Sequence, residues 1–180
     1  MSGRGEPTLA KNLGEAIKEI KKIRHEPIAV LTNSSLIMSP DVRRELALAD
    51  MACCKIDAFT NSVFHVMNKP AALVYFNGII KGIKLFKSKF KGKLALQFMF
   101  TNENIKEAGK LADLARQISP DEIHIGTPLR PSPVKALNKA QIRRIKGLFK
   151  GFRVLSPYDK APTKVNSLSP KETLRRRGKP

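Results

Sequence analysis

The stretch that decides the fold is NLGEAIKEIKKIRHEPIAVLT, residues 12–32. Its first part carries apolar residues at helical spacing, with Lys and Glu between them: Leu13, Ala16, Ile17, Ile20 and Ile23. Pro27 ends this pattern, and the short apolar run 28–32 that follows is typical of a buried strand. The stretch therefore predicts a helix over residues 12–24 and then a strand.

The same alternation continues along the chain. Apolar runs predict further strands at 51–56, 94–100 and 121–125, and helical spacing predicts helices at 39–49, 75–90, 104–118 and 138–150, with an irregular or helical insert at 61–69. Short strands that alternate with amphipathic helices indicate a parallel sheet with crossover helices. We therefore expect a single α/β domain over residues 1–158. Residues 159–180 are basic and lack periodicity, which predicts a flexible tail.

Composition limits the classes of protein. Hydrophobic residues make up 42% of the 180, which is enough for a core, and no apolar run reaches the length of a membrane helix. With no signal-peptide pattern either, we expect a cytoplasmic protein without a membrane partner. The net charge of +19 predicts attraction to RNA or DNA, or else a solvated basic surface. Only 6% of residues are aromatic, so a base-stacking platform is not evident.

The cysteines and histidines do not predict a metal site. Cys53 and Cys54 are the two cysteines, and neighbours on a strand point to opposite faces. They cannot supply the three or four thiolates of an iron–sulfur cluster, and their spacing does not fit zinc. We expect two small buried residues. The three histidines stand in unrelated contexts, and the sequence contains no P-loop, Rossmann fingerprint or serine elbow.

Polar residues follow every predicted strand. Ligand sites of parallel α/β sheets lie beyond the carboxyl ends of the strands, so these residues predict a small-molecule site at one rim, although strand exits are polar turns in general. The residues concerned are Thr32, Asn33, Asp57, Thr101, Asn102, Thr127 and Arg130. Glu6 joins them on the expectation that it follows a strand whose body is missing.

Each of these side chains has two interpretations. Glu6 could accept hydrogen bonds from an ammonium group or cap the helix that follows it. Asp57 could accept from ribose hydroxyls or pair with a nearby lysine. Arg130 could hold a carboxylate or phosphate, or form a structural salt bridge. Asn33 could bridge a ligand or make a turn.

Seven segments in order resemble one branch of the radical S-adenosylmethionine (SAM) proteins, the iron–sulfur oxidoreductases related to enzymes that make wybutosine-type tRNA bases. They are SGRGEPTL (2–9), AVLTNSSL (29–36), DVRRELALA (41–49), KIDA (55–58), NKP (68–70), GKLALQFM (92–99) and TPLRPSP (127–133). The resemblance implies a partial (βα) barrel with SAM and a 4Fe–4S cluster at its rim. It implies reductive cleavage of SAM to a 5′-deoxyadenosyl radical, which takes a hydrogen atom from a substrate.

The resemblance also assigns roles to individual residues. Gly5 and Glu6 match the element that binds the methionine end of SAM, and Thr32, Asn33 and Asp57 match pocket residues. Thr127, Pro128 and Arg130 match the loop after the last strand, which faces the substrate.

The sequence departs from this family in places. The cluster motif Cys-x-x-x-Cys-x-x-Cys is absent, so the resemblance implies a barrel that lacks its first strand and most of its second. Ser34 stands where the family usually has Gly, Cys53-Cys54-Lys55 replaces a Pro-Ser-Leu run, and Lys69 replaces an Arg.

Three explanations of the missing part stay open: a misplaced start codon, a split gene and a repurposed remnant. A sheet cut at its second strand has an open edge, which predicts an N-terminal half or a second copy as partner. Two functions follow from the sequence. The first is a radical SAM protein that is incomplete or inactive alone. The alternative is a non-catalytic basic protein on the same fold that binds tRNA or another nucleic acid.

Overall fold

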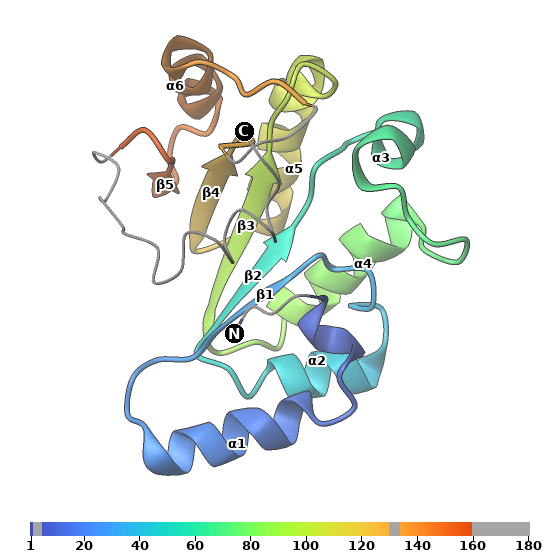
Figure 1. The fold of residues 1–180 in the computed structure, drawn as a ribbon, viewed down its shortest axis with the longest axis vertical. Helices are drawn as coiled ribbons and strands as arrows, with labels where there is room; N and C mark the ends of the chain where they lie inside the picture. The colour runs from blue at the N-terminus through green and yellow to red at the C-terminus, as the bar shows by residue number, and fades with distance from the viewer. Residues whose placement is uncertain (2–4, 130–133, 160–180) are drawn as a thin grey trace, which may run out of the picture.

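A sheet of five parallel strands forms the centre of the protein. The computed structural model describes residues 1, 5–129 and 134–159 (Figure 1). The strands follow one another in chain order: β1 (Ala29–Thr32), β2 (Met51–Lys55), β3 (Lys93–Met99), β4 (Glu122–Gly126) and β5 (Val154–Leu155). Each strand pairs with the next one along the chain, and because every pair is parallel, all the carboxyl ends meet at one rim.

The helices form between the strands where the sequence alternates. They are α1 (Leu13–Ile23), α2 (Pro40–Leu46), α3 (Asn61–Asn68), α4 (Phe76–Lys87), α5 (Ala108–Ile118) and α6 (Lys139–Leu148), with short 3₁₀ turns η1 (Pro7–Leu9) and η2 (Ile105–Glu107). Asn138 begins α6 with a reciprocal capping box to Gln141, which satisfies backbone groups that the helix leaves free. Among the described residues, the helices are all too short or too polar to cross a membrane.

The two faces of the sheet differ in chemistry. One face packs against the helices in a single apolar core, which includes Val30, Cys54 and Leu96 from the strands. The alternate strand residues point to the other face, where Lys55, Gln97 and His124 are only half-buried. A parallel sheet covered by helices on one side and polar on the other is a partial (βα) barrel, which confirms the predicted fold class.

The predicted strands and helices are confirmed, and the insert at 61–69 takes the helical one of its two expected forms, α3. Two elements were not predicted, η1 and β5, because runs of three and two residues are too short for a sequence pattern. The helix predicted over 39–49 ends at Leu46, and the helix predicted over 104–118 begins with the 3₁₀ turn η2. The predicted tail lies mostly outside the described residues, so the domain boundary near residue 158 stays a prediction.

The outer edge of β1 carries a backbone neighbour from the same chain. The amino group of Met1 donates to the Ala29 carbonyl, and the Leu31 N–H donates to the Met1 carbonyl at 3.1 Å. This pair of bonds is the pattern of neighbouring parallel strands. Met1 therefore lies where a strand beside β1 would lie, at the edge that we expected to be open.

Helix α4 approaches the loop after β1 closely at Gly82. A Cβ at this position would lie 2.7 Å from Ile37 Cγ2 and 2.9 Å from the Ile37 carbonyl carbon and oxygen. We expect Gly82→Ala to destabilise the protein by about 1–3 kcal/mol, because the backbone of the loop must move. Chemical denaturation measures the loss.

The matched control is Gly109→Ala in α5, where nothing lies within 4 Å of the added atom. This control should be neutral or stabilising by up to about 1 kcal/mol, since alanine favours helices. Equal stability of the two variants would contradict the packing of α4 against the loop.

Candidate functional site

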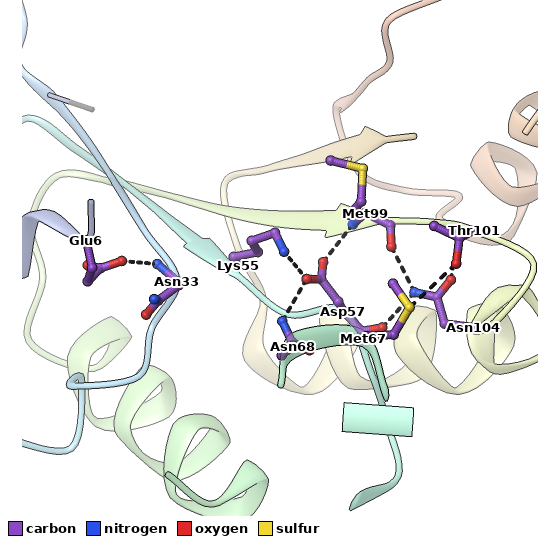
Figure 2. Close-up of polar contacts among 9 residues, drawn as sticks. All are labelled: Glu6, Asn33, Lys55, Asp57, Met67, Asn68, Met99, Thr101 and Asn104. Atoms are coloured by element: carbon purple, nitrogen blue, oxygen red, sulfur yellow. Dashed lines mark hydrogen bonds and ion pairs between the residues drawn. The ribbon is translucent and has the colours of Figure 1, made fainter. Parts of the chain in front are cut away.

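Glu6 joins the N-terminal loop to the exit of β1. Its Oε2 accepts from the Asn33 N–H at 2.6 Å (Figure 2). Its Oε1 accepts from the Thr32 hydroxyl at 2.5 Å and from the Thr8 N–H and hydroxyl at 3.2 and 2.8 Å. Glu6 is therefore the N-cap of the short turn η1, whereas the helix predicted after it, α1, has Asn12 at its N-cap. Three residues that the sequence proposed for one site, Glu6, Thr32 and Asn33, are in direct contact.

Accessible polar groups remain at this end of the rim. The Glu6 carboxylate is only partly buried, and Oε2 accepts a single bond among the described residues. Gly5 is exposed, and no atom lies within 4 Å of where its Cβ would be. The Asn33 side chain turns back to accept from the Ser35 N–H at 2.9 Å, which is the turn that the sequence left open. The arrangement offers a carboxylate and open backbone to a cationic group.

Ser34, the residue after this turn, has a left-handed backbone with φ of +67° and is fully buried. Residues other than glycine pay for this conformation, because Cβ approaches the neighbouring carbonyl. The family that the sequence resembles usually has glycine here, and the left-handed backbone of this residue gives the physical reason.

Asp57 forms a second cluster at the exits of β2 and β3 (Figure 2). Its Oδ2 accepts from Lys55 Nζ and from Asn68 Nδ2, the latter at 2.9 Å, and its Oδ1 accepts from the Met99 N–H at 2.8 Å. The side chain is 1% exposed. Of the two interpretations, the lysine pair is the one that the structure forms. Direct contact with a ribose stays a prediction.

Asn104 completes the Asp57 cluster. Its amide nitrogen donates to the Asp57 and Met99 carbonyls at 2.6 and 2.8 Å, and its oxygen accepts from the Thr101 N–H at 2.9 Å (Figure 2). The side chain is fully buried. This role of Asn104 was not predicted, although Asn close after a strand is a recognised turn signal.

The residues expected on the substrate side are only partly described. Thr127 is buried, and its hydroxyl accepts from the Leu137 N–H at 2.8 Å, so it holds the loop after β4 against the start of α6. Arg130 lies outside the described residues.

A third group on the polar face of the sheet was not predicted. Cys53 Sγ lies 3.7 Å from His124 Nδ1, and His124 Nε2 lies 2.8 Å from Glu122 Oε1. Burial, with repulsion from Glu122, raises the pKa of the Cys53 thiol to about 12, so the thiol stays protonated. The sequence could not pair residues 71 positions apart, which meet only through the register of β2, β3 and β4.

The described residues do not fit an iron–sulfur cluster. Cys54 points into the core, away from Cys53, and burial raises its pKa also to about 12. Cluster ligands are thiolates, and they come in threes or fours. Within the described part of the chain, no three His, Cys, Asp or Glu side chains lie close enough to hold a metal ion.

Several solved structures share the architecture at low identity. The match to Streptococcus suis SuiB bound to S-adenosylmethionine has a TM-score of 0.68 at 14% identity and covers 84% of this chain and 37% of that one. A radical SAM methyltransferase from Sphaerobacter thermophilus matches with a TM-score of 0.63 at 19% identity, over 87% of this chain and 49% of that one. The protein has the radical SAM fold. A domain of the pyruvate-formate lyase-activating enzyme from Bacteroides vulgatus also matches, with a TM-score of 0.64 at 13% identity over 87% of this chain and 96% of that one.

Sequence relatives are longer than this radical SAM-fold chain. The UPF0026 protein slr1464 of Synechocystis is 35% identical over 90% of this chain and 58% of its own length. The UPF0026 protein MJ1312 of Methanocaldococcus jannaschii is 32% identical over 78% and 44%. A GTPase Obg of Brachyspira hyodysenteriae is 28% identical over 96% and 27%. The chain thus spans less than two thirds of each relative, and no family model matches it.

The Asp57 cluster gives a test of stability. Asp57→Asn should cost about 2–3 kcal/mol of unfolding free energy, because it leaves Lys55 without its anion and an N–H donor facing other donors. The value lies below that of a fully buried pair, because the Lys55 side chain is 29% exposed. Urea denaturation measures the change.

The control for this substitution is Asp113→Asn. Asp113 pairs with Arg116 at the surface and its side chain is 70% exposed. The control should change stability by no more than about 0.5 kcal/mol. A similarly small effect of Asp57→Asn would show that the buried cluster does not hold the rim.

The backbone at Ser34 gives a second test. The Ser34→Gly variant should be more stable than Ser34→Ala by about 1 kcal/mol, because the Cβ of alanine destabilises a left-handed backbone. Residue 147 in α6 is the control, where alanine should be more stable than the native glycine by about 0.5–1 kcal/mol. An alanine preference at both positions would refute the left-handed turn at the β1 exit.

Proposed function

We propose that this chain forms the SAM-binding side of a radical SAM site. The observation that carries the proposal is the contact of Glu6 with Thr32 and Asn33, which fixes the N-terminal loop against the strand carboxyl ends. Ligands of parallel α/β sheets bind at this rim. The radical SAM fold and a structural neighbour with S-adenosylmethionine bound support the choice of ligand.

The rim residues divide the work of binding. The Glu6 carboxylate and the open backbone at Gly5 accept from the methionine ammonium, while Thr32 and the Asn33 N–H hold Glu6 in place. A charge-assisted hydrogen bond of this kind is stronger than a neutral one. Asp57 acts through structure, because it ties the exits of β2 and β3 together. In radical SAM proteins, bound SAM supplies a 5′-deoxyadenosyl radical on reductive cleavage.

The reductive step itself is not assigned to this chain. Its two cysteines are adjacent and protonated, so a second copy of the chain would bring the same unsuitable pair. A different polypeptide segment with a Cys-x-x-x-Cys-x-x-Cys motif would have to supply the cluster. The relatives, which extend well beyond the matched region, have room for such a segment.

Calorimetry with SAM tests the proposal. Wild-type protein should bind saturably, and Glu6→Gln should lower the affinity about 10- to 100-fold through loss of a charged acceptor. Glu103→Gln is the control, an exposed glutamate after β3 that should leave the affinity unchanged. A SAM analogue without the α-amino group should bind wild type and Glu6→Gln equally.

Thermal unfolding of each variant establishes that it is folded. Folded wild-type protein that does not bind SAM would overturn the proposal. Equal affinities of the Glu6→Gln and Glu103→Gln variants would also overturn it, because Glu6 would then make no contact with the ligand.

A further inference from the structure

A groove with an apolar floor runs between α4 and α5. It has a volume of about 610 Å³. Its floor is formed by Phe59, Phe76, Ile80 and Leu114, and Lys81 and Lys84 of α4 line it. We call this surface the α4–α5 groove. None of its lining residues has a role in the proposed SAM site.

The segment that forms one wall of the groove is purely cationic. Residues 58–102 contain no Asp or Glu, and their charged side chains are Lys69, Lys81, Lys84, Lys87, Lys89, Lys91 and Lys93. Lys87 is neutralised by Asp121 at 2.8 Å. Within the described part of the chain, no carboxylate lies within ion-pair distance of Lys81 or Lys84, and Lys84 meets only the neutral Gln117, at 3.1 Å. These charges are available for an anion.

Beside the groove, a cation from α5 lies over one of the aromatic rings that line it. Lys110 of α5 stands over the Phe59 ring, with Nζ 5.6 Å from the ring centre. Phe59 is only half-buried and lies 6.4 Å from the Phe76 ring. The low aromatic content gave no sign of a stacking surface in the sequence, but the fold gathers these rings at one place. Lysines beside an aromatic surface are the combination with which proteins hold single-stranded nucleic acids.

Phe59 is held in position by a buried acid. Glu107 is 8% exposed, and its carboxylate accepts from the Phe59 N–H at 2.7 Å and from the Thr60 hydroxyl at 2.6 Å. Phe59 also follows the Asp57 cluster by two residues, so the groove begins next to the rim. A nucleic-acid chain bound in the groove would therefore lie close to the Asp57 cluster at the rim.

We propose that the α4–α5 groove binds single-stranded nucleic acid. Lys81, Lys84 and Lys110 contact the phosphates, and a base packs against Phe59. Charge complementarity favours a polyanion, and the aromatic floor favours a nucleobase over an acidic peptide. The inference does not depend on SAM binding, and each can fail without the other.

Fluorescence anisotropy with a labelled 12-nucleotide oligouridine tests this assignment. The triple variant Lys81→Glu, Lys84→Glu, Lys110→Glu should lose at least tenfold in affinity. Its salt dependence, the slope of log K against log salt, should fall by about 2, which is about 0.7 for each phosphate contact. The control carries the same charge change on exposed lysines elsewhere, Lys11→Glu, Lys18→Glu, Lys150→Glu, and should lose less than threefold.

Phe59→Leu separates stacking from charge, because it keeps an apolar side chain and removes the ring. We expect a loss of five- to tenfold for this variant with an unchanged salt slope. Circular dichroism melts check that all variants fold. An equal loss in both triple variants would overturn the proposal, as would no binding by the wild type. Wild-type affinity of Phe59→Leu, with polyglutamate competing as well as RNA, would instead identify an acidic protein partner and refute it.

Discussion

The rim of this protein depends on one buried carboxylate. Asp57 comes at the exit of β2, yet its oxygens accept from the backbone of β3 at Met99 and from the end of α3 at Asn68. A buried charge is tolerated only when it is fully paired, and Lys55 supplies the opposite charge. The same cluster therefore fixes three elements, and through Asn104 it also fixes the turn after β3.

Two carboxylates at the rim thus have different uses. Asp57 has no free surface and acts as a structural tie, whereas Glu6 is partly exposed and retains acceptor capacity. This difference in burial separates a residue that shapes a site from one that can contact a ligand. It also explains why the proposed binding site lies at the β1 exit rather than at the centre of the sheet.

The open face of the sheet and the α4–α5 groove lie on opposite sides of the strands. The open face carries Cys53, His124 and Glu122 in contact, and the groove carries lysines on a helical surface. The composition predicted a basic surface but could not say where on the fold it would lie. The structure places two of these lysines, Lys81 and Lys84, on α4 along the α4–α5 groove.

The sequence by itself determined the alternation of strands and helices, because apolar periodicity depends only on neighbouring residues. It also determined that Thr32 and Asn33 fall at a strand exit and that two adjacent cysteines cannot hold a cluster. Only the tertiary structure decided that the Asp57 carboxylate pairs with Lys55, that Cys53 contacts His124, and that Lys110 lies over the Phe59 ring. The second and third contacts join residues on different elements. Lys55 and Asp57 are close in sequence, but burial by the surrounding chain decides that Asp57 pairs with lysine. Strand register and packing set such contacts, and no local pattern encodes them.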